Sequence, residues 1–264
     1  MSSAAVSSAE PAVLPGAEAW SSPGSGSWAD VGVLVLHGFT GTPQGVRGWA
    51  ESLAAHGLTV SVPRLPGHGT RWQDLQRTRW QDWFGEAERA LTDLQQRCST
   101  VFVAGLSVGG ALTLRLAETH PEIAGIVTVN ASLATRRPEA RLLPLVRWIV
   151  PSFPGVVGDI KKPGVTEVGY PRLPLHAVHS LSRLWALTRA DLGRIGCPVL
   201  AFRSVVDHVV EPVSGELLVA GVRAGGAPVE ERVLAESYHV ATLDNDAPAI
   251  MDGTWEFIRR VSSR

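Results

Sequence analysis

Cysteine is scarce in this chain. Cys98 and Cys197 are the only two among 264 residues, which excludes a disulfide framework as the source of stability. Each precedes a predicted strand with another strand between them, so at about 4.8 Å per strand their backbones lie roughly 10 Å apart. A disulfide needs Cα atoms within about 7 Å of each other. We therefore expect two free thiols and a cytoplasmic protein.

An excess of charge of one sign is also lacking. The 24 Lys and Arg residues balance 25 Asp and Glu residues to a net charge of −1, which gives no electrostatic reason to bind nucleic acid or an anionic membrane surface. No apolar run approaches the length of a membrane span. No Lys or Arg precedes Arg47, so the basic start of a secretory signal is missing. We expect no nucleic-acid partner, no integral membrane segment and a neutral ligand.

What the chain does have is an alternation of apolar strands and amphipathic helices. Runs such as Val31–Leu36 are apolar throughout, as strands buried on both faces should be. This alternation is typical of an α/β fold with a mostly parallel, doubly wound sheet. We predict strands at 31–36, 58–62, 101–104, 123–129, 198–202 and 229–234. We predict helices from 43 to Gly57, with Thr42 as the N-cap, at 80–97, directly after Ser107 and at 247–261.

Residues 131–190 break this alternation with seven prolines and scattered apolar patches. So long a connection inside a compact domain is usually functional, and ligands bind outside the carboxyl ends of strands in open α/β sheets. We predict a cap at 131–190, inserted into a core of residues 13–130 and 191–264. An extra helical layer that does not touch substrate is the alternative. Residues 1–12 are expected to be a disordered tail, with a short edge strand within residues 11–20.

Ser107 stands in a G-x-S-x-G motif, Gly105 to Gly109, between a predicted strand and a predicted helix. In that context the serine occupies a strained turn that lifts its hydroxyl out of the sheet edge. Glycine is needed on either side because a Cβ would collide with neighbouring backbone. We predict that Ser107 is a nucleophile. The alternative is an N-cap serine in a glycine-rich turn.

A nucleophilic serine needs a general base, and the base needs an orienting carboxylate. On this kind of fold the chain order is serine, acid, histidine. Asp207 follows the strand at 198–202 and His239 follows the last strand, so we predict these two as acid and base. Glu211 is the main rival for the acid. Asp244 or Asp246 would require a reversed order.

The remaining histidines give weaker signals. His208 directly follows Asp207, and adjacent side chains on a turn point apart, so we expect a surface or packing role. His176 and His179 have a spacing that could suit a metal, but no carboxylate or thiol stands at ligand spacing beside them. We therefore expect neither a metal nor an organic cofactor.

Attack on an acyl carbon creates an oxyanion, which preorganised donors must stabilise. The backbone N–H of Val108 at the start of the helix is one predicted donor. The N–H of Phe39, after His37-Gly38 at the end of the first strand, is the other. A plain glycine-rich turn is the alternative for this second loop.

These motifs together resemble those of a known family. They are similar to the bacterial monoacylglycerol lipases and related carboxylesterases of the α/β-hydrolase fold, over about residues 13 to 260. The tail Ser237–Asp244 together with Asp207–Val210 is far more specific than G-x-S-x-G alone. The motifs that carry the resemblance are Leu36–Gly41, Pro63–Gly69, Gly105–Gly110, Asp207–Val210 and Ser237–Asp244.

The resemblance implies an α/β-hydrolase fold with its triad on Ser107, Asp207 and His239, and its oxyanion hole on Phe39 and Val108. It also implies a cap glutamate near the glycerol end of the substrate, for which Glu167 is the candidate. A solvated surface carboxylate is the alternative for Glu167. Upstream of Asp159 the cap departs from the family pattern, which leaves the preferred acyl chain length open.

We therefore expect an ester hydrolase that acts on neutral lipids, monoacylglycerols first, through an acyl-enzyme on Ser107. The apolar cap also suits weak contact with lipid surfaces. A broad carboxylesterase, or a thioesterase or acyltransferase with the same triad, is the first alternative. A catalytically silent, ligand-binding version of the fold is a distant third. Oligomeric state cannot be read from the sequence.

Overall fold

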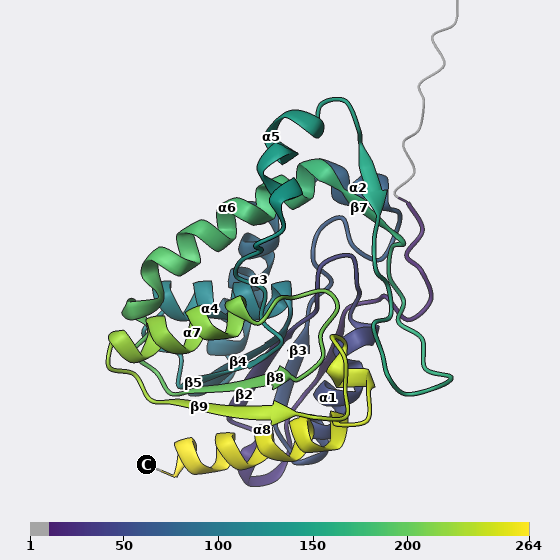
Figure 1. The fold of residues 1–264 in the computed structure, drawn as a ribbon. Coiled ribbons are helices and arrows are strands. Elements are labelled where there is room, and N and C mark those ends of the chain that lie inside the picture. Colours follow the sequence, from purple (N-terminus) through teal and green to yellow (C-terminus); the bar gives the residue numbers. More distant parts are fainter. Residues whose placement is uncertain (1–10, 264) are drawn as a thin grey trace, which may run out of the picture.

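Seven strands form the central sheet of the computed structural model, which describes residues 11–263 (Figure 1). Neighbouring strands are parallel, apart from an antiparallel strand at one edge. The mostly parallel α/β sheet is therefore confirmed. In spatial order the strands are β1 (Trp20–Ser22), β3 (Thr59–Val62), β2 (Val31–Leu36), β4 (Thr100–Leu106), β5 (Gly125–Val129), β8 (Val199–Ser204) and β9 (Val229–Leu234).

The edge strand differs from its predicted place. Only Trp20 of residues 11–20 belongs to β1, which continues to Ser22 and pairs with β3. Pro15 and Gly16 come before it, and Gly16 has a φ of 82° in a turn closed by the N–H of Ala17. Proline cannot donate a ladder hydrogen bond, and a left-handed glycine bends the chain. Residues 1–10 of the predicted tail lie outside the described residues.

Alternate residues of β2 enter two separate cores. Val33 and Val35 pack in one cluster with Trp49 and Phe257, whereas Leu34 and Leu36 pack in the other. This alternation follows from the two-residue period of a strand. One face of the sheet is covered by α1 (Gln44–Ala55) and α8 (Ala247–Ser262), and the other by α3 (Trp80–Gln95), α4 (Val108–Thr119), α6 (Leu175–Asp191) and α7 (Val213–Ala224) (Figure 1).

Outside the predicted insertion, the α-helices α2 (Trp72–Arg77) and α7 were not predicted from the sequence. The start of α1 also differs from the expectation, because Thr42 does not cap it. The Thr42 hydroxyl instead donates to the carbonyl of Val168, 3.0 Å away, and the helix begins at Gln44. A long-range contact has here replaced a local cap.

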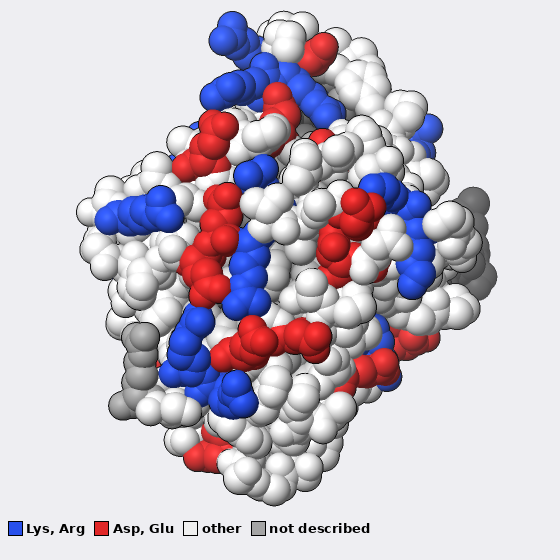
Figure 2. All heavy atoms as spheres, turned by 60° about the horizontal axis from the view of Figure 1, so that its bottom comes forward, with Lys and Arg blue, Asp and Glu red and all other residues white. Residues whose placement is uncertain are grey.

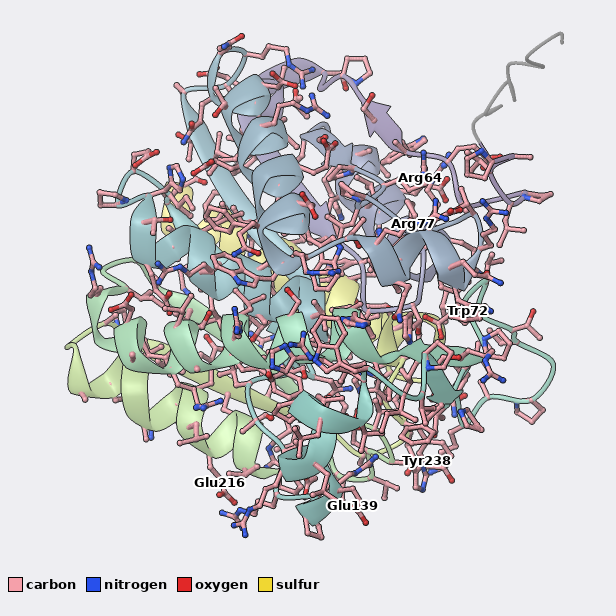
Figure 3. The ribbon with its side chains drawn as sticks, turned by 90° about the horizontal axis from the view of Figure 1, so that it is seen from above. Arg64, Trp72, Arg77, Glu139, Glu216 and Tyr238 are labelled. Carbon is pink, nitrogen blue, oxygen red and sulfur yellow. The ribbon has the colours of Figure 1, made fainter. Side chains whose placement is uncertain are left out.

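The predicted insertion has an outer and an inner part. Its outer part rises above the carboxyl ends of the strands (Figure 1), with α5 (Leu143–Val146) and an antiparallel pair of β6 (Ser152–Pro154) and β7 (Arg172–Pro174). Seen from above (Figure 3), Glu139 of this part and Glu216 of α7 point outward at the same margin. The inner part includes α6, which packs against α2, α3 and α4.

The surface carries both signs of charge side by side. In the view from the α8 side (Figure 2), Lys and Arg side chains are interleaved with Asp and Glu side chains. Arg232, for example, pairs with Glu230 at 2.7 Å and with Glu256 at 3.4 Å. Cys98 precedes β4 and Cys197 precedes β8, with β5 between them, and both are free thiols as predicted.

Candidate active site

Ser107 lies in a strained turn between β4 and α4. Its φ of 55° falls in the left-handed region, which a residue with a side chain rarely adopts. The turn is possible because its flanking residues lack side chains: a Cβ on Gly105 would collide with the backbone of Gly109, and one on Gly109 with the carbonyl of Leu36. The turn places Ser107 at the carboxyl edge of the sheet, at the N-terminus of α4.

His239 and Asp207 form a buried pair near this turn. Nδ1 of His239 lies 2.8 Å from Oδ2 of Asp207, and both side chains are less than a tenth exposed. The other carboxylate oxygen accepts the N–H groups of Val209 (2.8 Å) and Val210 (2.7 Å). Burial opposes ionisation, but His239 and these two donors outweigh it and hold the pKa of Asp207 below its usual value. Asp207 is therefore ionised and hydrogen-bonded to the imidazole ring of His239.

The rival carboxylates have other partners. Glu211 accepts from the hydroxyl of Thr135, and Asp246 accepts the N–H of Glu236. Asp244 is buried and accepts backbone N–H groups only. None of the three contacts the ring of His239, so the geometry favours Asp207 as the orienting acid.

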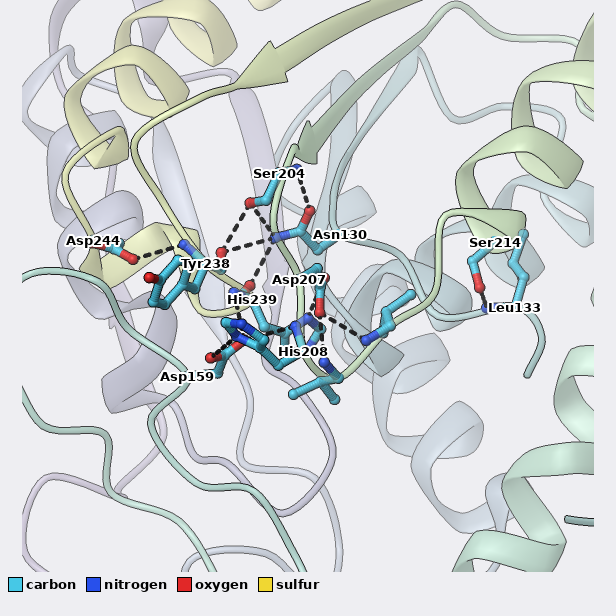
Figure 4. Close-up of polar contacts among 12 residues, drawn as sticks. Asn130, Leu133, Asp159, Ser204, Asp207, His208, Ser214, Tyr238, His239 and Asp244 are labelled. Atoms are coloured by element: carbon cyan, nitrogen blue, oxygen red, sulfur yellow. Dashed lines mark hydrogen bonds and ion pairs between the residues drawn. The ribbon is translucent and has the colours of Figure 1, made fainter. Parts of the chain in front are cut away.

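A residue that sequence reasoning missed, Asn130, holds the loop of His239. It directly follows β5 with a φ of 47°, and its amide nitrogen donates to the carbonyl of His239 at 2.8 Å (Figure 4). The amide oxygen accepts the N–H of Ser204 at 2.8 Å. A polar residue directly after a buried strand, at the carboxyl edge of the sheet, was the available signal.

A cavity of about 540 Å³ opens above Ser107 and His239. Both side chains are nearly buried, with 6% and 7% of their surface exposed. Most of the wall is apolar and comes from the insertion, so the insertion contacts whatever occupies the cavity. The apolar wall includes Leu142, Leu143, Val146, Phe153, Val156, Leu173, Leu175, Val178, Leu181 and Trp185.

The loop of Phe39 lies against the Ser107 turn, and Phe39 and Val108 both line the cavity. The buried ring of His37, whose role sequence reasoning missed, holds this loop. Its Nδ1 donates to the carbonyl of Gly38 at 2.9 Å and its Nε2 accepts the N–H of Leu65 at 3.1 Å. Burial lowers the pKa of His37 to about 4, which keeps the ring neutral and suited to one donor and one acceptor bond.

Glu167 also lines the cavity and is not a solvated surface side chain. Its Oε2 accepts the N–H of Gly158 at 3.1 Å, and its Oε1 faces Gly41, where a Cβ would lie 2.7 Å away. Burial raises its pKa above the usual value, against the opposing effects of the Gly158 donor and His239. A buried carboxyl group thus lines a mostly apolar cavity that also contains Ser107 and His239.

Comparison with known proteins agrees with this architecture. Residues 33–252 match the model of the alpha/beta hydrolase family. The chain belongs to that family. It is 43% identical over 233 residues to a thermostable monoacylglycerol lipase of Bacillus sp. (strain H-257), covering 87% of this chain and 91% of that one.

Two further relatives extend the comparison. A carboxylesterase of Bacillus subtilis (strain 168) is 26% identical over 235 residues, or 88% of this hydrolase and 94% of the relative. A solved structure from work on the metagenome-derived lipolytic enzymes LipS and LipT superposes with a TM-score of 0.89 at 42% identity, covering 94% of this chain and all of the other.

The described residues contain neither a cluster of metal ligands nor a membrane-spanning helix. Within residues 11–263, no three His, Cys, Asp or Glu side chains gather as a metal ion would require. His179 contacts Arg147 and the ring of His176 packs on Trp148. None of the helices in the described part is long and apolar enough to cross a membrane.

Proposed function

We propose that this hydrolase cleaves carboxylic esters of neutral lipids, monoacylglycerol to fatty acid and glycerol first, with Ser107 as nucleophile. One observation carries the proposal: Ser107 and His239 line one mostly apolar cavity, and His239 is paired with the carboxylate of Asp207. The similarity to proteins named monoacylglycerol lipase and carboxylesterase supports the reaction class.

The reaction proceeds by acyl transfer to the serine. His239 takes the proton of Ser107 as the serine oxygen attacks the ester carbonyl, and Asp207 stabilises the imidazolium. The backbone N–H groups of Phe39 and Val108 bind the oxyanion. The tetrahedral intermediate then expels the alcohol, which takes the proton from His239. A water molecule deprotonated by His239 attacks the acyl-enzyme, and the fatty acid leaves with Ser107 restored. Ser107 and water supply the nucleophiles and His239 transfers the protons, so the proposed reaction needs no cofactor.

The substrate class follows from the walls of the cavity. Its apolar lining suits an aliphatic acyl chain, and residues 131–190 act as the cap that supplies most of this lining. Glu167 lines the cavity together with Ser107 and His239, and its carboxyl accepts the backbone N–H of Gly158. It is placed to bind the hydroxyl groups of a glycerol leaving group.

The outer cap, residues 138–156, supports weak contact with lipid surfaces. Leu145, Trp148 and Ile149 are 72%, 71% and 84% exposed, and Arg147 lies over the ring of Trp148. Apolar side chains beside arginines are typical of segments that lie at a membrane interface. The free thiols are consistent with a cytoplasmic location.

Replacing Ser107 by Ala should abolish hydrolysis of p-nitrophenyl esters and labelling by a fluorophosphonate. Undiminished turnover by this variant would overturn the mechanism. Absence of labelling in the native protein would instead favour a catalytically silent binding protein. A panel of monoacylglycerols, short-chain esters and acyl-CoA, compared by kcat/KM, tests the substrate class. Preference for acyl-CoA would favour a thioesterase.

A further inference from the structure

Asp159, an acidic residue of the cap, contacts both loops that carry the acid and the base. Its Oδ2 accepts the backbone N–H of His239 at 3.2 Å and that of His208 at 3.1 Å. Its Oδ1 lies 2.8 Å from Nδ1 of His208, and its own carbonyl accepts the N–H of Val240 at 3.0 Å (Figure 4). One cap carboxylate thus joins the residue after Asp207 to the residue that serves as base.

The segment that carries Asp159 is itself fixed from the core. The buried carboxylate of Asp244 accepts the N–H groups of Lys161 at 2.6 Å and Lys162 at 2.9 Å, and also that of Tyr238 at 2.9 Å. Asp159 therefore reaches from the cap to the histidine loop, and Asp244 reaches from the core to the cap. Together the two carboxylates clamp residues 158–162 against residues 238–240.

We propose that Asp159 is a positioning residue, which acts on catalysis by holding the imidazole of His239 at the angle that serves both Asp207 and Ser107. The proposal rests on the proposed function of these three residues. The backbone of His239 has two side-chain anchors, because Asn130 binds its carbonyl and Asp159 binds its N–H. Removing Asp159 frees one side of this loop and releases the turn of His208 at the same time.

The same contacts link the substrate end of the cavity to the base. Gly158, the neighbour of Asp159, donates its N–H to Glu167. Consecutive residues of the cap thus hold the carboxyl proposed to bind the leaving group and the loop of the general base. The cap contributes to the catalytic geometry in addition to shaping the acyl channel.

The test compares three variants, each corrected for active sites by fluorophosphonate titration. Asp159→Ala should lower kcat by about 10²-fold, the size of effect that misplacing a catalytic group by about 1 Å produces. KM for a p-nitrophenyl ester should change little, because the apolar side chains that line the cavity are unaltered. Asp159→Asn keeps an oxygen that can accept the two backbone N–H groups, so it should retain most of the activity.

Glu236→Ala is the matched control. It removes a carboxylate that holds the same cap segment, but through an exposed ion pair with Lys161 at 2.8 Å. Such pairs contribute little to stability, so kcat should stay at the native value. A downfield proton NMR signal from Nδ1–H of His239 supplies a second readout. It should be present in the native protein and in Asp159→Asn, and shifted or lost in Asp159→Ala.

An unchanged kcat and NMR signal in Asp159→Ala would overturn the inference, as would equal losses in the Ala and Asn variants. A fall in thermal stability at full activity per titrated site would also overturn it, because it would mean a merely structural role. Ser107→Ala separates the two proposals. If that variant is inactive while Asp159→Ala is fully active, only the role of Asp159 fails; if Ser107→Ala is active, the proposed function fails.

Discussion

Two consecutive segments of the cap, which we call the outer cap and the strap, differ in how they contact the rest of the molecule. The outer cap, residues 138–156, exposes large apolar side chains, among them Ile149 at 84%. The strap, residues 157–170, is fastened along its length to core loops. Tyr170 illustrates this fastening: its N–H donates to the carbonyl of Thr40, and its hydroxyl donates to the carbonyl of Gly67 and accepts the N–H of Thr70.

The difference separates two tasks. Asp159 and Glu167, whose proposed roles need fixed positions, stand on the strap, where backbone hydrogen bonds hold them. The apolar side chains of the outer cap are proposed to contact lipid and to line the acyl channel, and these roles require no fixed polar contact. Precise geometry at a site depends on rigid support, whereas binding of apolar chains is non-directional.

The largest effect is expected from the loss of Asp244, which binds the strap to the core. Asp244→Ala leaves the N–H groups of Lys161, Lys162 and Tyr238 without their acceptor. Hydrogen bonds to a charged group contribute about 1.5–3 kcal/mol each, so we expect the free energy of unfolding to fall by at least about 3 kcal/mol. Urea unfolding of the variant beside Glu236→Ala measures this. A loss no greater than in that control would mean that the strap is not held by Asp244.

A smaller effect concerns the titration of Glu167 on the strap. Its pKa is raised in the folded protein, so it stabilises the fold most below its ordinary value of 4.5, and this contribution is lost as the pH rises through the raised pKa. Glu167→Gln keeps an acceptor for Gly158 and removes the titration. Its stability relative to the native protein should therefore increase from pH 4 to pH 7. A pH-independent difference in urea unfolding would contradict this.

The smallest effect on stability is expected at the outer cap. Ile149→Ser changes a side chain that is already in water, so the free energy of unfolding should stay within about 0.5 kcal/mol of native. Sedimentation with phosphatidylcholine vesicles should nevertheless show weaker binding. Val205→Ser, an exposed apolar residue at 58% outside the cap, is the control. Equal vesicle binding by the native protein and both variants would contradict the proposed contact of the outer cap with lipid surfaces.

Much of the fold could be read from local patterns. The bounds of β2 and β9 agree with prediction residue for residue, and α8 extends one residue past its predicted end. The strained turn at Ser107 was predicted because glycines flank it at fixed spacing. The edge strand was misplaced because its position depends on pairing with β3, which lies far along the chain.

The supports of the site could not be read in this way. From the sequence, Asn130 is only the last core residue before the predicted cap, and its contact with His239 spans 109 residues. Asp159 contacts residues 49 and 80 positions away, and no spacing in the sequence relates them. Asp244 was weighed only as a rival acid, although it fastens the strap. His208 was expected at the surface or in packing, and the structure adds a bond to Asp159.

By itself, the sequence determined the alternating strands and helices, the turn at Ser107, and the order in which Asp207 and His239 follow it. These features depend on periodicity and on the steric needs of single residues, which act over a few positions. Only the tertiary structure decided which carboxylate faces the imidazole, how the strap is clamped and which part of the cap stays exposed. Those outcomes depend on hydrogen bonds between distant segments, which form only once the sheet has brought the loops to one edge.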